Sequence, residues 1–217
     1  MSNTGVSSPG TLAQRLVPAR GALQRPFVRD GLLVLAGSLL MALTAQISIP
    51  LPFTPVPITG QTFGVLLIGA LLGPRLGALT MLLYLAEGLM GLPVFAGGRS
   101  AWTPSSFPGI PVIIGPTAGY LFSYPIAAAV VGALAHRGWD RRVRTALPAM
   151  ILGNIIILTL GFLWLAGATA LLRGSVDVLV LLNMAVLPFL PGDAIKILLA
   201  ALALPGGWRL LGMLDQQ

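Results

Sequence analysis

The sequence predicts an all-α integral membrane protein with six transmembrane helices. Hydrophobic residues make up 56% of its 217 residues and charged residues only 9%, whereas a soluble domain carries about 25% charged residues. A water-soluble globule of this size could not hide so much apolar surface. The apolar residues also form runs long enough to cross a bilayer, and the arginines gather in the connections between them. These three observations predict a multi-pass membrane protein.

The rare residue types narrow the kinds of site that the chain can hold. The absence of cysteine excludes disulfides, thiolate metal sites and cysteine nucleophiles. With a single histidine, His136, we expect no metal centre and no cofactor. The net charge of +7 reflects where the arginines fall along a membrane protein, so we expect no nucleic-acid partner.

The helices are expected in chain order, between two tails. Residues 1–30 are polar and carry four arginines, which favours a flexible basic cytoplasmic tail over a cleaved signal peptide. A six-helix membrane domain is expected over residues 31–205, and a cytoplasmic C-terminal tail over residues 206–217. The six apolar spans are Gly31–Ile49, Ile58–Leu72, Leu76–Pro93, Val112–Ala135, Ala146–Ala168 and Val178–Leu204.

A proline-broken segment follows the first helix. Four prolines lie between Pro50 and Pro57, and they favour extended, irregular chain. The second span has only 15 residues, or about 22 Å, against about 30 Å of hydrocarbon. We therefore expect the proline segment to enter the protein at membrane depth. Leu51–Pro55 and Leu187–Pro191 share a pattern, and two such broken segments mark a binding site in some transporters.

The long connection after the third helix has a different character. Residues 94–111 are rich in glycine and proline and contain one charged residue, Arg99. Glycines permit movement, and the aromatic residues of this segment could cover a ligand. We expect this loop to act as a lid.

The arginines predict which side of the membrane each connection occupies. Six helices with both termini in the cytoplasm put ten arginines inside and two outside, and this excess is typical of cytoplasmic connections. The inside set is Arg15, Arg20, Arg25, Arg29, Arg75, Arg137, Arg141, Arg142, Arg144 and Arg209, and the outside set is Arg99 and Arg173.

The last apolar segment contains a pair of ionisable residues. Asp193 and Lys196, the only lysine, are three residues apart and would share a helix face. Each would cost roughly 2.5–3.5 kcal/mol at the centre of a membrane helix, which favours a functional site over a structural ion pair. Pro191 and Gly192 suit the start of the helix. Lys196 precedes Arg209 by 13 residues, about 20 Å, which predicts a position in the outer half of the membrane.

Several motifs together resemble a known family. They are Ile49–Thr59, Gln61-Thr62, Gly69–Pro74, Gly91–Gly98, Gly115-Pro-Thr117 and Leu187–Lys196. Their order and spacing over residues 42–204 are similar to the BioY family, the biotin-specific substrate-binding (S) component of energy-coupling factor (ECF) transporters.

The resemblance implies a function and partners. It implies biotin uptake across the bacterial cytoplasmic membrane by a six-helix S component, and not an enzyme. A transmembrane coupling subunit and cytoplasmic ATPase subunits would supply the energy, since the chain has no phosphate-binding loop of the type G-x-x-x-x-G-K. Small residues on the first helix contact the coupling subunit in this family, and that spacing reads Ser38 and Ala42 here.

The chemistry of biotin fits a short set of candidate residues. The carboxylate requires a cation, and the two ureido N–H groups require acceptors. The polar candidates are Asp193, Lys196, Arg99, Glu87, Gln61, Tyr84 and Asn154, and the candidate wall or lid residues are Phe53, Phe95 and Trp102. The sequence does not settle which end of biotin meets which residue.

Each candidate also has a structural alternative. Arg99 could be solvated, Gln61 could cap a helix, and Asn154 could bond two helices. Glu87 could face the bundle or another subunit, and Trp102 could belong to an interfacial belt.

The sequence alone leaves three rival functions open. The chain could carry biotin without ATPase partners, or it could be an S component for another vitamin such as thiamine or riboflavin. An intramembrane enzyme that uses Asp193 and Lys196 is the least favoured, because no nucleophile has an adjacent base.

Overall fold

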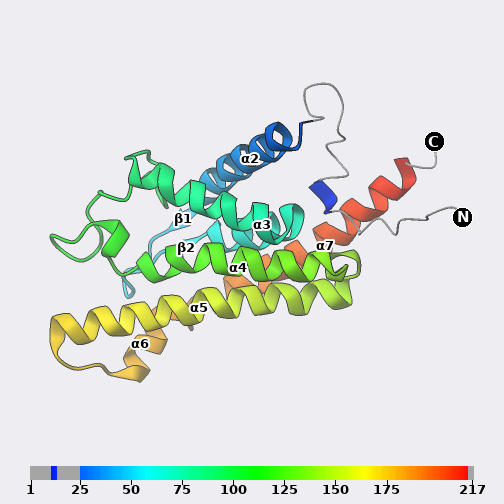
Figure 1. Ribbon diagram of the computed structural model, residues 1–217. Coiled ribbons are helices and arrows are strands. Elements are labelled where there is room, and N and C mark those ends of the chain that lie inside the picture. The colour runs from blue at the N-terminus through cyan, green and yellow to red at the C-terminus, as the bar shows by residue number, and fades with distance from the viewer. Residues whose placement is uncertain (1–10, 14–24, 215–217) are drawn as a thin grey trace, which may run out of the picture.

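The computed structural model describes residues 11–13 and 25–214 and confirms the all-helical fold (Figure 1). Within these residues, five helices are long and apolar enough to cross a membrane, judged by length and composition. They are α2 (Pro26–Gln46), α3 (Gln61–Leu89), α4 (Ala118–His136), α5 (Val143–Arg173) and α7 (Leu190–Leu214).

Helix α3 is a helical hairpin that contains both the second and the third predicted spans. Gly73 has φ of 82° and ψ of −178°, which interrupts the helix directly before Pro74. A positive φ of this size favours glycine because it has no Cβ. The chain reverses there, so that Gly77 packs closely against the Cα of Gly69. With its two arms counted separately, the described helices supply the six predicted crossings.

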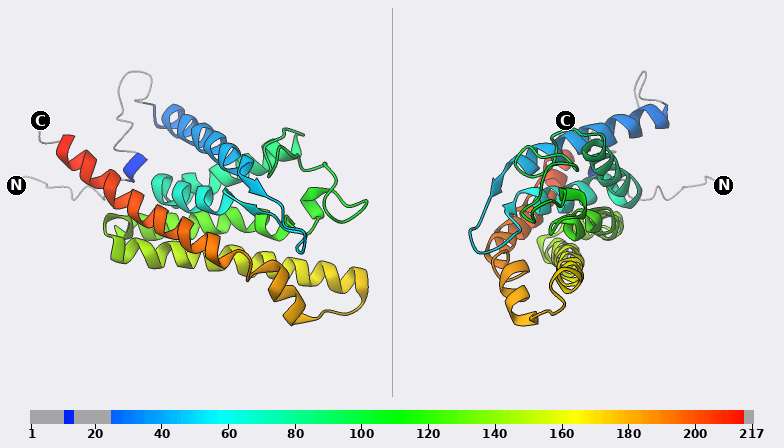
Figure 2. Two further views of the ribbon diagram at one scale, coloured as in Figure 1. Left: turned by 180° about the vertical axis from the view of Figure 1, so that it is seen from behind. Right: turned by 90° about the vertical axis from the view of Figure 1, so that its left-hand side faces the viewer.

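The proline-broken segment forms a β-hairpin, which the sequence did not predict. Strands β1 (Ser48–Ile49) and β2 (Ile58–Thr59) pair antiparallel, with Ser48 opposite Thr59. The first arm of α3 then begins at Gln61 and is only about 18 Å long. The hairpin occupies the space beyond this short arm, at the end of the bundle that also carries loop 94–111 (Figure 2). The strand pairing satisfies backbone groups at the base of the hairpin, whereas Ile49 and Phe53 are exposed.

Two helices extend into the expected tails. Helix α2 begins at Pro26, within the expected tail 1–30, because proline with its fixed φ is well suited to the first turn of a helix. Helix α7 continues through Pro205 to Leu214, so that residues 206–214 are helical. The remaining residues of both tails, 1–10, 14–24 and 215–217, including Arg15 and Arg20, lie outside the described residues.

Two of the later apolar spans are also broken. The fourth begins as a short 3₁₀ helix, η2 (Val112–Ile114), before α4 starts at Ala118. The sixth divides into α6 (Val178–Ala185) and α7. The break falls on the Pro188–Pro191 region, since proline disfavours a continuous helix. Helix α7 therefore starts beside the pair, with Asp193 in its first turn, as the sequence predicted.

The basic connections gather at one end of the bundle. The start of α2, the turn of α3, the α4–α5 connection and the end of α7 lie there, opposite loop 94–111 and α6 (Figures 1 and 2). In the α4–α5 connection, the 3₁₀ helix η3 (Trp139–Arg141) holds α7 in place. Trp208 Nε1 donates to Asp140 Oδ2 at 2.6 Å, and Arg141 stacks on the Trp208 ring. Burial raises the pKa of Asp140.

Candidate functional site

The two proline-broken segments meet at the loop end of the bundle. Thr54 Oγ1 donates to the carbonyl of Met184 at 2.6 Å, which ties the β-hairpin to the end of α6. Val56 and Pro57 from the first segment and Phe189 from the second line the same cavity. The two proline-broken segments therefore contribute two walls of one pocket, as such segments do in some transporters.

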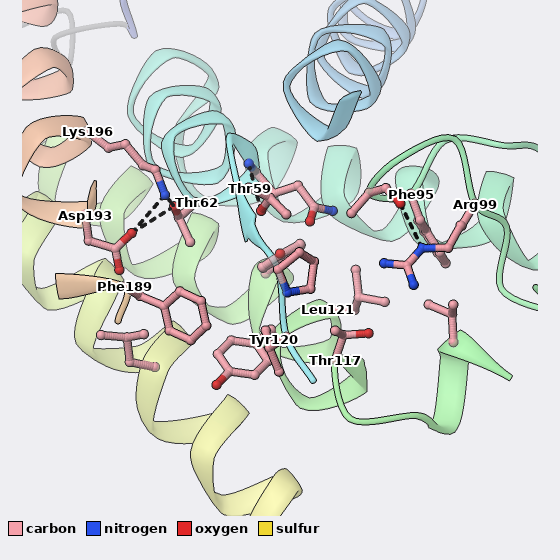
Figure 3. A pocket seen from close by; sticks show the side chains of 17 residues that line it. Thr59, Thr62, Phe95, Arg99, Thr117, Tyr120, Leu121, Phe189, Asp193 and Lys196 are labelled. Atoms are coloured by element: carbon pink, nitrogen blue, oxygen red, sulfur yellow. Dashed lines mark hydrogen bonds and ion pairs between the residues drawn. The ribbon is translucent and has the colours of Figure 1, made fainter. Parts of the chain in front are cut away.

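This cavity lies between the β-hairpin, α3, loop 94–111, α4, α5 and α7 (Figure 3). The space between its lining atoms, with the open space at its mouth included, amounts to about 580 Å³. Its walls are mainly apolar, with polar groups at a few positions. The lining residues are Val56, Pro57, Thr59, Gln61, Thr62, Phe95, Ala96, Arg99, Val112, Thr117, Tyr120, Leu121, Tyr124, Leu158, Phe189, Asp193 and Lys196.

The Asp193–Lys196 pair forms one end of the pocket (Figure 3). Lys196 Nζ lies 3.0 Å from Asp193 Oδ1 and donates to Thr62 Oγ1, also at 3.0 Å. The Asp193 side chain is 3% exposed and that of Lys196 is 17% exposed, so the lysine lies closer to the open space. The i,i+3 spacing of a helix places both groups on one face, as the sequence predicted.

Asn154 supports this pair from outside the pocket. Its Nδ2 donates to Asp193 Oδ2 at 3.1 Å, across the α5–α7 contact, and Asn154 does not line the cavity. Both carboxylate oxygens of Asp193 thus have partners inside the protein. The positive charge of Lys196 is compensated by Asp193, so this end of the pocket combines donors and acceptors without net charge.

Arg99 forms the opposite end of the pocket (Figure 3). A tight turn holds it: Phe95 N donates to the Arg99 carbonyl at 2.8 Å, and Arg99 Nε donates to the Ala96 carbonyl at 2.9 Å. No carboxylate of the described residues forms an ion pair with this guanidinium. Burial lowers the pKa of Arg99, yet arginine remains protonated in proteins. This end therefore carries an uncompensated positive charge.

Gln61 and Phe95 line the pocket, whereas Tyr84 lies behind them. Gln61 Nε2 donates to Tyr84 Oη at 2.8 Å, and the fully buried Tyr84 does not line the cavity. The Tyr84 and Phe95 rings pack with centroids 5.3 Å apart. The structure thus joins three of the predicted residues in one contact group, with Tyr84 as their support.

Glu87 and the first-helix residues lie elsewhere in the bundle. Ser38 lies 2.9 Å from Glu87 Oε1, and Glu87 does not line the cavity. Ser38 is buried, and Ala42 packs against the core. These two small residues therefore face the inside of this chain. Ser38 has a polar partner there, Glu87 on α3. The surface that α2 presents outward instead includes Leu32, Leu35, Leu39 and Leu43.

Two predicted wall residues also lie outside the pocket. Trp102 is 62% exposed, and its Nε1 donates to the carbonyl of Leu89 at 2.8 Å. Phe53 is 57% exposed, near the tip of the β-hairpin. An exposed tryptophan with one backbone bond fits the alternative of an interfacial belt.

Sequence reasoning missed five lining residues that are prominent in the structure. Thr62 directly follows the predicted Gln61, and Thr117 begins a helical i, i+3, i+7 series with Tyr120 and Tyr124. Phe189 lies inside the second proline-broken segment. The series on one face of α4 was a usable signal, since three polar-tipped residues there are unusual in an apolar helix.

The fold and the pocket define a class: a multi-pass helical membrane protein with a binding cavity for a small, partly polar ligand. Residues 13–213 match the BioY family. Because this match spans nearly the whole sequence, the chain belongs to that family.

Individual relatives agree with this assignment. The chain is 41% identical over 179 residues to the biotin transporter BioY of Rhodobacter capsulatus, a match that covers 79% of this chain and 88% of the relative. It is 36% identical over 162 residues to a probable biotin transporter BioY of Pyrococcus horikoshii, covering 73% and 85%. Among solved structures, it resembles the S-component for biotin from an ECF-type ABC transporter, with a TM-score of 0.69 and 25% identity over 92% of this chain and 96% of that chain.

Proposed function

We propose that this chain captures biotin for uptake into the cell, as the S component of an ATP-driven ECF transporter. Membership of the BioY family, the relatives that carry the name biotin transporter, and the similarity to an S-component for biotin support this function. They also argue against the intramembrane enzyme considered from the sequence.

The distribution of charge in the pocket is the observation that carries the proposal. Biotin has a carboxylate at one end, a cyclic urea at the other, and an apolar thioether ring beside the urea. Arg99 is the uncompensated cation of the pocket, whereas Lys196 is already paired with Asp193. A carboxylate gains most from a charge that has no partner, and arginine can bind it with two parallel hydrogen bonds. We therefore assign the carboxylate to Arg99.

The ureido ring then belongs at the opposite end, beside Asp193 and Lys196. A cyclic urea carries two N–H donors and one carbonyl acceptor, so it needs both acceptors and a donor. Asp193 supplies carboxylate oxygens, and Lys196 supplies N–H groups within one helical turn. The side chains of Phe189, Tyr120 and Leu121, which lie between the two ends in Figure 3, would pack against the apolar ring.

The proposal also includes the orientation of the chain in the membrane and its partner subunits. The ten-to-two distribution of arginines supports an orientation with the basic end of the bundle in the bacterial cytoplasm and the pocket near the outer face. A coupling subunit in the membrane and cytoplasmic ATPase subunits would drive release. The exposed leucine face of α2, rather than Ser38 and Ala42, offers an apolar surface for the coupling subunit.

Ligand binding to the purified protein tests the function directly. Isothermal titration in detergent should give saturable binding of biotin and no binding of thiamine or riboflavin. Binding of either vitamin in place of biotin would favour an S component of another specificity. Purification of the tagged chain from its own host should also recover ATPase subunits. Biotin uptake by the chain alone, with no ATPase recovered, would favour the stand-alone carrier.

A further inference from the structure

Tyr84 makes two hydrogen bonds directly behind the pocket wall. Its hydroxyl donates to the carbonyl of Val94 at 2.9 Å, at the start of loop 94–111. The same oxygen accepts from Gln61 Nε2 at 2.8 Å. Tyr84 is fully buried and Gln61 is 4% exposed, so water cannot readily replace either bond.

The direction of these bonds follows from the chemistry of the three groups. A backbone carbonyl can only accept, so the single hydroxyl proton of Tyr84 must point to Val94. The Tyr84 oxygen is then left as an acceptor and must receive a proton from Gln61. This requirement settles the orientation of the Gln61 amide, which cannot be read from the positions of its similar terminal atoms alone.

The orientation determines what Gln61 offers to a ligand. Gln61 lines the cavity and directs its NH₂ group to Tyr84, which leaves its Oε1 outside this bond. No donor of the described residues bonds this oxygen. Tyr84 takes one N–H of the amide and a second N–H remains on the same nitrogen, so the amide cannot exchange its oxygen and its NH₂ group without losing the bond to Tyr84.

The surrounding packing keeps Tyr84 in this position. The Phe95 ring fills the space beside Tyr84 and lies so close to Gly88 that a Cβ at that position would collide with it. The side chains of Tyr84 and Phe95 are both almost completely buried. The phenol therefore has no room to turn its hydroxyl from Val94, and the amide of Gln61 remains fixed.

We propose that Tyr84 is a positioning residue that keeps the Gln61 amide from turning over, so that Oε1 meets the ligand and the pocket selects ligands presenting an N–H group to this oxygen. The inference rests on the proposed function, in which that group is one ureido N–H of biotin. A ligand with an oxygen at this point would set two acceptors against each other. The pocket would reject it, because a buried polar group without a partner is costly.

Affinity ratios for matched ligands test this role. The probes are biotin and the two cyclic carbamates in which one or the other ureido N–H is replaced by oxygen. The wild type should bind one of these carbamates about 100-fold more weakly than biotin. Tyr84→Phe removes the hydroxyl and frees the Gln61 amide to turn its NH₂ toward the ligand. The biotin-to-carbamate ratio should then fall to about 10-fold or less.

A control and a second variant separate positioning from general damage. Thr80→Val removes another buried hydroxyl from the same arm of α3, where Thr80 donates to Leu76, but it should leave the ratio unchanged. Gln61→Met removes the acceptor itself and should also lower the biotin-to-carbamate affinity ratio to about 10-fold or less. This variant tests the inference if Tyr84→Phe does not fold. Equal weakening of all three ligands by Tyr84→Phe would overturn the inference. A wild type that binds biotin and both carbamates alike would overturn it too, while leaving the proposed function intact. A wild type that does not bind biotin at all would contradict both this inference and the proposed function.

Discussion

Removal of the charges of the Asp193–Lys196 pair, singly and then together, should separate binding from stability. Lys196→Met retains the length of the side chain, and Asp193→Asn retains its shape. Breaking a buried ion pair costs about 3–5 kcal/mol, because the remaining charge loses its compensation. Asp193 is 2% exposed, so Lys196→Met leaves a carboxylate deep in the protein with only Thr62 and Asn154 as partners. We expect each single variant to lower the free energy of unfolding by an amount of this order.

The double variant provides the decisive comparison. Asp193→Asn/Lys196→Met carries no charge at this position, so its stability should recover to within about 1–2 kcal/mol of the wild type, since replacing both partners is often nearly neutral. Biotin binding should not recover, because the groups that meet the urea are lost. Each variant, single or double, should bind biotin at least about 100-fold more weakly, which corresponds to about 2.7 kcal/mol.

The assay combines two measurements on the same detergent-purified samples. Thermal or chemical unfolding reports stability, and calorimetric titration reports biotin affinity. A double variant that regained both stability and near-normal affinity would refute the reasoning, because the pair would then be structural. In that case Gln61 and the threonines of the pocket would have to recognise the urea without the pair.

Four further outcomes are expected from other parts of the molecule. Arg99→Gln should weaken biotin about 100-fold but leave the affinity for biotin amide almost unchanged, as titration with both ligands would show; equal losses would place the carboxylate elsewhere. Hydrogen exchange in loop 94–111 should slow on saturation with biotin, whereas an unchanged rate would mark an ordinary connection. Gly132→Ala should lower stability by about 1–3 kcal/mol, because the added methyl group meets the backbone of Gly73 and Pro74; Gly167→Ala on the open side of α5 is the matched control, and similar melting of both variants would contradict the packing argument. Reporter fusions at both termini should indicate the cytoplasm, and a signal from the outside at either end would invalidate the assigned topology.

The sequence predicted those features that depend on composition and local spacing. Long apolar runs defined the crossings, and the i,i+3 spacing placed Asp193 and Lys196 on one face, because helical geometry fixes both relations. It also placed Arg99 and Phe95 among the candidates, and the structure brings them to the same cavity.

Other features depend on the rotation of one helix against another, which spacing does not specify. Glu87 and Tyr84 are three residues apart, yet one contacts Ser38 on α2 and the other contacts Gln61 beside the pocket. Tyr120 reaches the pocket from α4 only because that helix packs between α3 and α5. The two-residue strands β1 and β2 were not predicted either, since such short pairing has no periodic signal.

The charges that line the pocket have a consequence for the energy of the whole protein in its bilayer. Arg99 and Lys196 contribute two positive charges and Asp193 one negative charge, so the empty cavity has a formal charge of +1. A bound monocarboxylate reduces this sum to zero. Because the solvation energy of a buried ion depends on its net charge, the occupied protein pays far less than the empty one when its pocket moves into a region of lower dielectric constant. Occupancy by an acid therefore changes which depths in the membrane are accessible to the pocket, and an uncharged analogue of the same shape should not produce this change.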